Sequence, residues 1–355
     1  MSDLSVSLQS QQKYTLPTGV LDCEVSADGR MLYAACMDGV YQVPLDGGEP
    51  QRLYEHESYA SGVHLDPHRD VLISAGYDGQ LVWFDLSRRT IFRRVLAHRF
   101  WSWQSARSPD GRLLATVTGQ YMVGGEKYEP AAETEPSVKV CDVATGEMLH
   151  AFSHVPSVQS VCFSPDSQHV AAGNLLGQIR IWNVKDGAKV ADWKTDAFTS
   201  WGIIKSHCYI GGIFGLVFSP AGDTLLAAGM GPMTDPMAGN GRQLWQRFAW
   251  QENPPRLVDQ THDGESGEGL MEAIAHHPSR PLFLMGGRLR GGDWNAAAFS
   301  AEDGRRLQHV NTNYRITQAR FTPDGGRVIL AGFDKQKGPE KGEYPKFGML
   351  EVFSV

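Results

Sequence analysis

Short apolar runs recur along this chain, and each is interrupted by a tight turn. One arrangement returns seven times: an apolar run, a four-residue turn of the kind Ser-Pro-Asp-Gly, and a second apolar run such as Val71–Ala75. Proline presets φ for the second position of a turn, and Asp or Gly suits the positions after it. The turns are Ser26–Gly29, Asp66–Arg69, Ser108–Gly111, Ser164–Ser167, Ser219–Gly222, His277–Arg280 and Thr322–Gly325. Such a repeat predicts an all-β protein built from similar small sheets.

Each repeat continues with a second turn and a strand that ends near an aromatic–polar pair. These pairs include Phe84-Asp85, Trp182-Asn183 and Phe353-Ser354. Here the sequence resembles the WD40 family, whose repeats end their third strand in Trp-Asp. The most similar stretch is Val158–Asn183, and Asp78–Asp85 is the next. The resemblance covers essentially the whole chain and implies a seven-bladed β-propeller of degenerate repeats.

The resemblance also implies a buried hydrogen-bond network of His, Ser or Thr, Asp and Trp in each blade, but no repeat holds all four. His56, Ser74 and Asp78 fit three of the places in repeat two, where a phenylalanine stands in the tryptophan place. Repeat four keeps His154 and Trp182. We therefore expect the blades to depend more on apolar packing between them than on that network.

The two ends of the sequence fit together in this fold. The last repeat stops at its third strand, and a strand-like segment, residues 5–16, precedes the first repeat. In this family the N-terminal segment usually completes the last blade and closes the ring, which leaves no unpaired end blade. We expect one domain, residues 1–355. Its blades are expected at residues 18–58, 59–99, 100–154, 155–207, 208–264, 265–312 and 313–355 plus 5–16.

Extra residues gather on one side of the expected blades. In a four-stranded meander a-b-c-d, the b–c turns and the d–a connections lie at the same end, here called the top side. The number of residues from the turn proline to the Trp-Asp position is smallest in blade two and larger in blades three, five, six and seven. With Trp245 as the marker of blade five, the d–a connections after blades four and five are also long. We expect every substantial insertion on the top side.

The insertions carry Tyr, Trp and Arg, which are enriched at binding hot spots. Long loops in a compact repeat fold are often functional, although their aromatic residues can also serve only to pack the loops onto the blades. The expected partner-binding residues are Trp101, Trp103, Tyr121, Tyr128, Trp201, His207, Arg288, Arg290, Trp294, Tyr314 and Lys335.

A charged cluster is expected at the channel of the propeller. Glu24, His64 and Arg320 stand two residues before the turn in the first strands of blades one, two and seven. These blades would be neighbours in a closed ring. Such a cluster can be a structural ion pair or a functional site.

Metal and catalytic chemistry find less support. Six of the 12 histidines lie near the ends of d strands, where the WD40 resemblance places a structural histidine, although a ring of histidines could bind a transition metal. The acidic loop His262–Gly269 could hold calcium but matches no calcium-loop pattern, which favours a solvated loop. The glycine-rich stretches fit neither a phosphate-binding loop nor a nucleophile elbow. We assign no catalytic residue, metal ligand or cofactor.

Composition narrows the class of protein. The chain is 41% hydrophobic and 21% charged, as in soluble globular proteins. Its net charge of −7 argues against general nucleic-acid binding, which needs a basic surface. No apolar run of about 18 residues predicts a membrane helix. The first residues do not form a secretory leader, and the five cysteines show no metal-like spacing, so we expect a reduced, cytoplasmic protein.

The WD40 resemblance implies a non-catalytic scaffold that binds a protein or peptide through the top side. The alternative is an enzyme, or a propeller that binds a small ligand or a metal at the top of its channel. A flat, aromatic-rich surface would favour the scaffold. A deep pocket with converging His, Asp or Glu side chains would favour the enzyme.

Overall fold

The structure, a computed structural model, is a seven-bladed β-propeller with almost no helix, as the sequence predicts. It describes residues 5–66, 68–119, 123–124, 129–130, 132–155, 157–198, 212–235, 240–289, 292–340 and 343–355. Each blade is a four-stranded antiparallel sheet. The chain divides into two compact units, residues 1–94, 272–289 and 293–355 in the first and residues 95–271 and 290–292 in the second.

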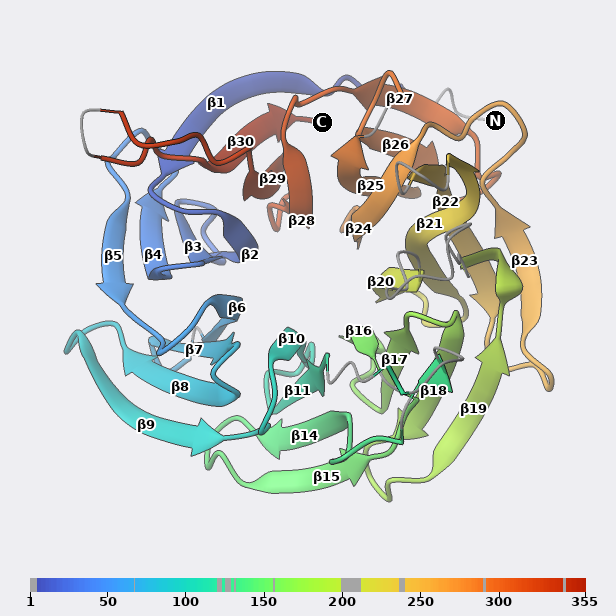
Figure 1. The fold of residues 1–355 in the computed structure, drawn as a ribbon, viewed down its shortest axis with the longest axis horizontal. Coiled ribbons are helices and arrows are strands. Elements are labelled where there is room, and N and C mark those ends of the chain that lie inside the picture. Colours follow the sequence, from blue (N-terminus) through green and yellow to red (C-terminus); the bar gives the residue numbers. More distant parts are fainter. Residues whose placement is uncertain are drawn as a thin grey trace. The chain divides into compact units, whose positions relative to one another are not determined.

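The first unit holds blades one, two, six and seven, drawn in blue, cyan, orange and red in Figure 1. Blades one and two consist of β2 (Val20–Val25), β3 (Met31–Cys36), β4 (Gly39–Pro44) and β5 (Gln51–Tyr54), then β6 (Ala60–Asp66), β7 (Val71–Gly76), β8 (Gln80–Asp85) and β9 (Thr90–Leu96). Blade six consists of β24 (Gly269–His276), β25 (Leu282–Leu289), β26 (Ala296–Ser300) and β27 (Arg306–Val310). The last residues of β9 and the first of β24 fall in the second unit.

Blade seven is assembled from both ends of the chain. Its strands are β28 (Arg315–Phe321), β29 (Arg327–Phe333), β30 (Gly348–Ser354) and β1 (Gln9–Leu16). β1 pairs antiparallel with β30, from Gln9 opposite Ser354 to Leu16 opposite Gly348. The predicted completion of the last blade by an N-terminal strand is therefore confirmed.

The second unit holds blades three, four and five. Their strands are β10 (Ser102–Arg107), β11 (Leu113–Thr118), β14 (Val138–Asp142) and β15 (Met148–Phe152); β16 (Val158–Phe163), β17 (His169–Asn174), β18 (Gln178–Asn183) and β19 (Lys189–Lys194); and β20 (Gly212–Phe218), β21 (Leu225–Asp235), β22 (Asn240–Ala249) and β23 (Arg256–Gln260). A two-stranded ribbon, β12 (Val123–Gly124) and β13 (Glu129–Pro130), lies in the b–c insertion of blade three. The 3-10 helix η1 (Asp196–Phe198) follows β19.

Apolar side chains fill the spaces between neighbouring blades of a unit. Leu16, Leu32 and Leu350, from blades seven and one, are fully buried in one cluster. Phe198 and Phe248 are buried in a cluster that joins blades four and five. Burying a leucine or phenylalanine side chain contributes about 1.5–3 kcal/mol. The expected importance of packing between blades agrees with these clusters.

Blade five corrects one alignment made from the sequence. In blade four, Trp182 pairs with Val170, and the equivalent residue of blade five, Leu225, pairs with Phe248 rather than with Trp245. Trp245 lies three residues earlier, opposite Ala228, and is fully buried. The extra residues of blade five lengthen the strands β21 and β22 instead of forming a separate loop. Their backbone N–H and C=O groups can then pair with each other along the longer ladder.

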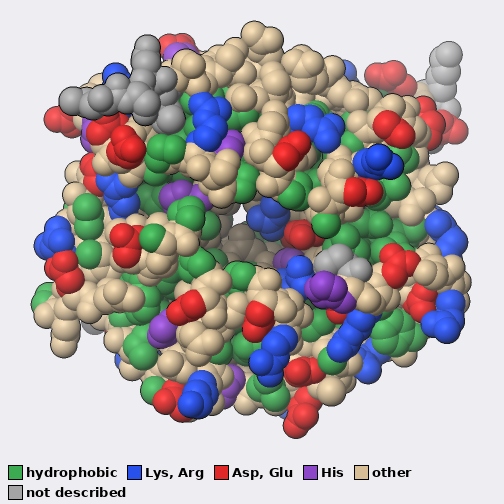
Figure 2. All heavy atoms as spheres, turned by 180° about the vertical axis from the view of Figure 1, so that it is seen from behind, with side chains coloured by type: hydrophobic (Ala, Val, Ile, Leu, Met, Phe, Trp, Pro, Cys, Tyr) green, Lys and Arg blue, Asp and Glu red, His purple; other side chains and the backbone are tan. Residues whose placement is uncertain are grey.

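Charged side chains of both signs are interspersed on the surface. Figure 2 shows Lys and Arg beside Asp and Glu over the visible face, and no broad area of that face carries one sign. This mixture fits a chain with 33 basic and 40 acidic residues.

Candidate functional site

A β-bulge near the start of the innermost strand re-aims one side chain in at least six blades. The pairing of strands a and b shifts after the first residue or two, between Val20 and Asp22 in blade one and between Val158 and Ser160 in blade four. Such a bulge leaves one extra residue unpaired and turns its side chain. The extra residues are Leu21, Ser61, Trp103, Gln159, Phe214 and Thr317. One of them, Trp103, is an expected partner-binding residue.

In the first unit an arginine is fixed beside a set of aromatic rings on the top side. Arg315 begins β28, and its Nε and Nη2 donate hydrogen bonds to the two carboxylate oxygens of Glu272, each at 2.7 Å. The guanidinium carbon also lies 5.1 Å from the centre of the Phe333 ring. A bidentate pair of this kind fixes the geometry of the guanidinium as well as adding energy.

Two tyrosines extend this group. Tyr77 follows β7, and burial raises its pKa to about 12, with smaller effects from the charges of Arg315 and Glu272. The Tyr59 ring lies 5.6 Å from the Tyr77 ring, and Tyr59 is 44% exposed. We call Tyr59, Tyr77, Glu272, Arg315 and Phe333 the aromatic–arginine patch. Sequence reasoning missed all five, because Tyr59 and Tyr77 stand in connections of minimal length.

The expected channel cluster is organised by a residue that the sequence did not single out, Asp22. Arg320 donates from Nη2 to Asp22 Oδ1 at 3.2 Å and from Nε to the Cys23 carbonyl oxygen at 3.0 Å. Asp22 also accepts hydrogen bonds from Gln318 Nε2 and from the Val63 backbone N–H. Burial raises the pKa of this carboxyl, and the charge of Arg320 opposes that shift. Asp22 thereby links β2, β6 and β28.

The three predicted members of the cluster have different surroundings. Arg320 forms the ion pair with Asp22, and the nearby carboxylates of Asp22 and Glu24 favour its charged form and raise its pKa against the effect of burial. His64 is buried, at 3% exposure. The arrangement is a network that joins three inner strands of one unit.

Blade two contains a complete polar network. The His56 Nδ1 lies 3.1 Å from Asp78 Oδ2, and its Nε2 lies 2.7 Å from Ser74 Oγ. The Tyr54 hydroxyl donates to Ser74 Oγ at 3.0 Å, and the Tyr54 ring stacks on Phe84 with centroids 4.6 Å apart. Burial alone would raise the pKa of Asp78, but the hydrogen bond and charge of His56 hold it below its usual value. Tyr54 thus supplies the donor that Phe84 lacks, although blade two, as expected, does not hold all four residues of the family network.

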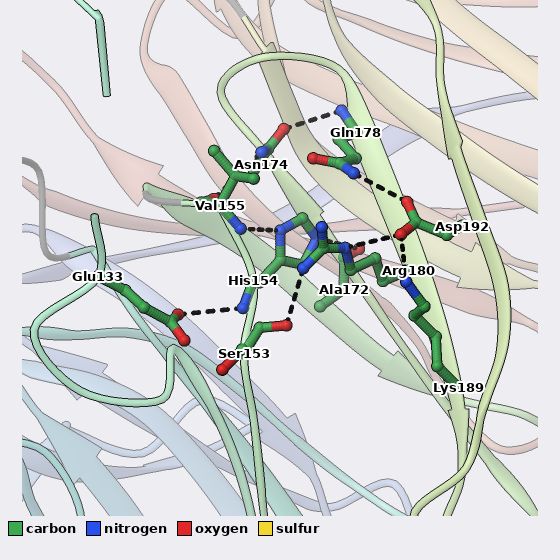
Figure 3. A network of polar contacts seen from close by, with 10 residues as sticks. All are labelled: Glu133, Ser153, His154, Val155, Ala172, Asn174, Gln178, Arg180, Lys189 and Asp192. Carbon is green, nitrogen blue, oxygen red and sulfur yellow. Dashed lines mark hydrogen bonds and ion pairs between the residues drawn. The ribbon is translucent and has the colours of Figure 1, made fainter. Parts of the chain in front are cut away.

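In blade four, the buried histidine has other hydrogen-bond partners (Figure 3). His154 donates from Nε2 to the Ala172 carbonyl oxygen at 3.3 Å, and its backbone N–H donates to Glu133 Oε2 at 3.0 Å. Asp192 accepts from Arg180 Nε at 3.1 Å and from Lys189 Nζ at 2.6 Å. The buried histidine is therefore held by a carbonyl, and the carboxylate lies at the surface with the basic residues.

The predicted partner-binding residues occupy varied positions. Trp101 is 47% exposed and stacks on Phe100, with centroids 5.0 Å apart. Trp294 is 3% exposed, with the Arg306 guanidinium over its ring, and Tyr314 is 6% exposed and donates to the Leu330 carbonyl oxygen. Arg288 is half-buried and Lys335 is exposed. Five of the predicted residues lie outside the described residues, namely Tyr121, Tyr128, Trp201, His207 and Arg290.

Among the described residues, no group of three or more His, Cys, Asp or Glu could hold a metal ion. Within the same ranges, no helix has the length and apolarity needed to cross a membrane. Cys23, Cys36, Cys141 and Cys162 are buried free thiols, and burial raises the pKa of Cys141 to about 12. A thiol with so high a pKa is a poor nucleophile at neutral pH.

Comparison with known proteins agrees with the geometry. The family described as "WD domain, G-beta repeat" matches residues 146–183, which include β15, the outer strand of blade three, and β16 to β18 of blade four. The chain is similar to the WD repeat-containing protein SL1-17 of Schistosoma mansoni, with 27% identity over 169 residues, 39% of this chain and 56% of that protein. It is also similar to Jouberin of Rattus norvegicus, with 26% identity over 188 residues, 50% of this chain and 17% of that protein.

A shorter match is to telomerase protein component 1 of Mus musculus, 32% identical over 114 residues, which are 32% of this chain and 4% of that protein. The chain thus spans little more than half of one of these relatives and a small part of the other two. The seven-bladed fold, the matched repeat and the WD-repeat relatives agree, and together they show a β-propeller with a WD40 repeat at residues 146–183 and similarity to WD-repeat proteins.

Proposed function

We propose that this chain is a non-catalytic scaffold that binds a protein or peptide partner through the top side of its blades. The matched WD40 repeat and the similarity to WD-repeat proteins support a role in protein interaction, because repeat architectures of this kind present broad binding surfaces built from their loops. The finer part of the proposal concerns which residues make the contact.

The aromatic–arginine patch is the observation that carries the proposal. The charge of Arg315 is already compensated, because its guanidinium pairs with Glu272 at 2.7 Å. A partner that covers the patch therefore need not bury an uncompensated charge. Tyr59 is 44% exposed beside the largely buried Tyr77. Tyrosine and arginine are the residue types most often found at the energetic centres of interfaces.

The second unit offers its own candidates on the top side. The stacked pair Phe100 and Trp101 is exposed, and Trp103 and Phe214 stand at bulges of the inner strands β10 and β20. Between them Gln159 holds Ser157 Oγ through its Nε2 at 2.6 Å. The other residues predicted from the sequence to bind a partner remain part of this proposal, and the buried Trp294 and Tyr314 would act through the loops they support.

The experiment is quantitative affinity capture with the full chain. Tyr59→Ala removes an exposed ring, so it should cost the fold little, and we expect at least a fivefold loss of the specific partners that the wild-type protein retains. Leu149→Ala is the matched control, because Leu149 is equally exposed, at 44%, on the outer strand β15. Isotope-labelled mass spectrometry measures retention in parallel.

The control protein should retain the same partners as wild type. If Tyr59→Ala and Trp101→Ala both capture every specific partner at wild-type levels while remaining folded, binding through these top-side residues is ruled out.

A further inference from the structure

The outer strand of blade two, β9, has a free edge with alternating exposed side chains. β9 is the last strand in the sheet order β6-β7-β8-β9, so one of its edges pairs with no strand of the blade (Figure 1). An edge strand presents alternate N–H and C=O groups that can pair with another chain. Exposure alternates along β9, and the side chains at positions 90, 92, 94 and 96 are the exposed ones.

This edge is basic in an acidic protein. Residues 85–96 contain four arginines and one aspartate, a local formal charge of +3, whereas the whole chain carries −7. Asp85 pairs with Arg88 at 2.7 Å. The strand itself holds Arg93 and Arg94 and no acidic residue.

Two other outer strands, β19 and β1, are balanced by acidic partners. On β19, Lys189 pairs with Asp192 at 2.6 Å. On β1, Lys13 pairs with Glu351 at 3.0 Å. An extended acidic segment would therefore find at β9 a complementarity that β19 and β1 do not offer.

Apolar surface lies on the same edge. Phe92 is 52% exposed and Leu96 is 65% exposed, with Arg94 between them on the same side of the strand. The Arg93 guanidinium lies 5.3 Å from the ring centre of the buried Trp83 and 5.7 Å from that of Phe92. Edge strands that only need protection from aggregation carry charge and little exposed apolar surface. This one presents charge and exposed apolar side chains in alternation.

We propose that β9 binds an acidic, extended segment of a partner protein as an added fifth strand of blade two. Backbone hydrogen bonds along the free edge would supply affinity. Phe92 and Arg94 lie on one face of the strand, so with Arg89 they would select a segment in which acidic and apolar residues alternate at every second position, because side chains two residues apart in a strand share a face. This surface is separate from the top side, so the inference does not depend on the proposed function.

The test uses the full chain and a fluorescein-labelled 12-residue peptide in which Glu and Val alternate at every second position and Thr fills the positions between them, with fluorescence anisotropy as the readout. The double variant Arg89→Glu/Arg94→Glu reverses two charges at exposed positions and should weaken binding at least tenfold. The matched control Lys189→Glu/Lys194→Glu makes the same change in charge on β19, where both side chains are about half exposed, and should change affinity less than twofold. The variant Tyr59→Ala should bind the peptide like wild type.

A second measurement tests the mode of binding. If the peptide adds as a strand, amide hydrogen exchange across residues 89–97 should slow when it is bound, because the edge N–H groups gain partners. Equal weakening in both double variants would show attraction to overall charge and overturn the proposal. Undiminished binding of a peptide with Gln in place of Glu would overturn it as well, as would unchanged exchange at β9.

Two further measurements distinguish a partner segment from two other possible occupants of the β9 edge, a second copy of this chain and a lipid surface. Sedimentation that shows self-association of the wild type, abolished by Arg89→Glu/Arg94→Glu, would assign the edge to a second copy of this chain and refute the partner segment. Tighter binding to phosphatidylserine vesicles than to the peptide would refute it in favour of a lipid surface.

Discussion

In blade two, the Tyr54 hydroxyl donates the hydrogen bond to Ser74 that a tryptophan would make in the family network. Tyr54 lies on β5, the outer strand of blade one, and phenylalanine stands in the tryptophan place. The sequence reveals His56, Ser74 and Asp78, because these residues keep the spacing of the repeat. It does not reveal Tyr54, which reaches Ser74 from the end of β5. Tyr54 stands only two residues before His56, but the family network has no donor at that position, so reading the family pattern misses it.

Asp22 was missed for a different reason. The sequence prediction took one position from each inner strand, two residues before the turn, and Asp22 stands four residues before it. In a regular strand, alternate residues face the same side, so Asp22 shares a side with Glu24. The bulge at Leu21 precedes both residues, and their pairing with β3 is regular.

At the level of one residue, His154 predicts a pH effect on stability. Burial, with a smaller effect from the charge of Arg180, lowers its pKa to about 3, whereas an unfolded histidine has a pKa of about 6.5. Between these values the unfolded chain binds a proton that the folded chain does not. The stabilising effect is thus fully present above pH 6.5 and is lost as the pH falls towards 3, by about 1.4 kcal/mol per pH unit.

Urea unfolding at pH 7.0, 6.0 and 5.0 measures this slope. The variant His154→Gln cannot take up the proton, so its free energy of unfolding should decline less steeply below pH 6.5 than that of wild type. His98, whose pKa burial lowers to about 4, adds a similar contribution that persists in the variant. Identical slopes for the two proteins would contradict the role assigned to His154.

At the level of elements, the sequence predicts the strands well because the turns mark them. Ser108–Gly111 and Thr322–Gly325 each join the first two strands of a blade, and Gly111 and Gly325 have φ angles of 76° and 72° that favour glycine. Blade five misled the alignment because Trp245 is an aromatic residue in the right strand but three positions early. The sequence prediction missed the aromatic–arginine patch because it took binding residues from the long insertions, whereas Tyr59 and Tyr77 stand in short connections.

The outer strand β1 should be essential to blade seven. Leu16 is fully buried in the cluster that joins blades seven and one, so Leu16→Ala should lower the free energy of unfolding by about 2–5 kcal/mol. Gln11→Ala, at an exposed position of the same strand, should change it by less than about 0.5 kcal/mol. Urea midpoints of the two variants measure the difference. Equal and small effects would mean that β1 contributes little to the blade.

At the level of the whole molecule, the boundaries between the two units bear on cooperativity. They fall after Arg94 and Met271, inside β9 and β24, whereas independent domains are normally joined by exposed linkers. We therefore predict one calorimetric transition, with equal calorimetric and van 't Hoff enthalpies. Two resolved transitions, only one of them shifted by Leu16→Ala, would show that the units unfold independently.

The pairing of β1 with β30 has a consequence for how the protein is made. Residues 9–16 leave the ribosome long before their partner strand, residues 348–354. At translation rates of roughly 5–20 residues per second, β1 waits about 20–70 s before its blade can form. During that interval Tyr14 and Leu16 have no place to be buried, so the nascent chain offers chaperones an unpaired apolar segment.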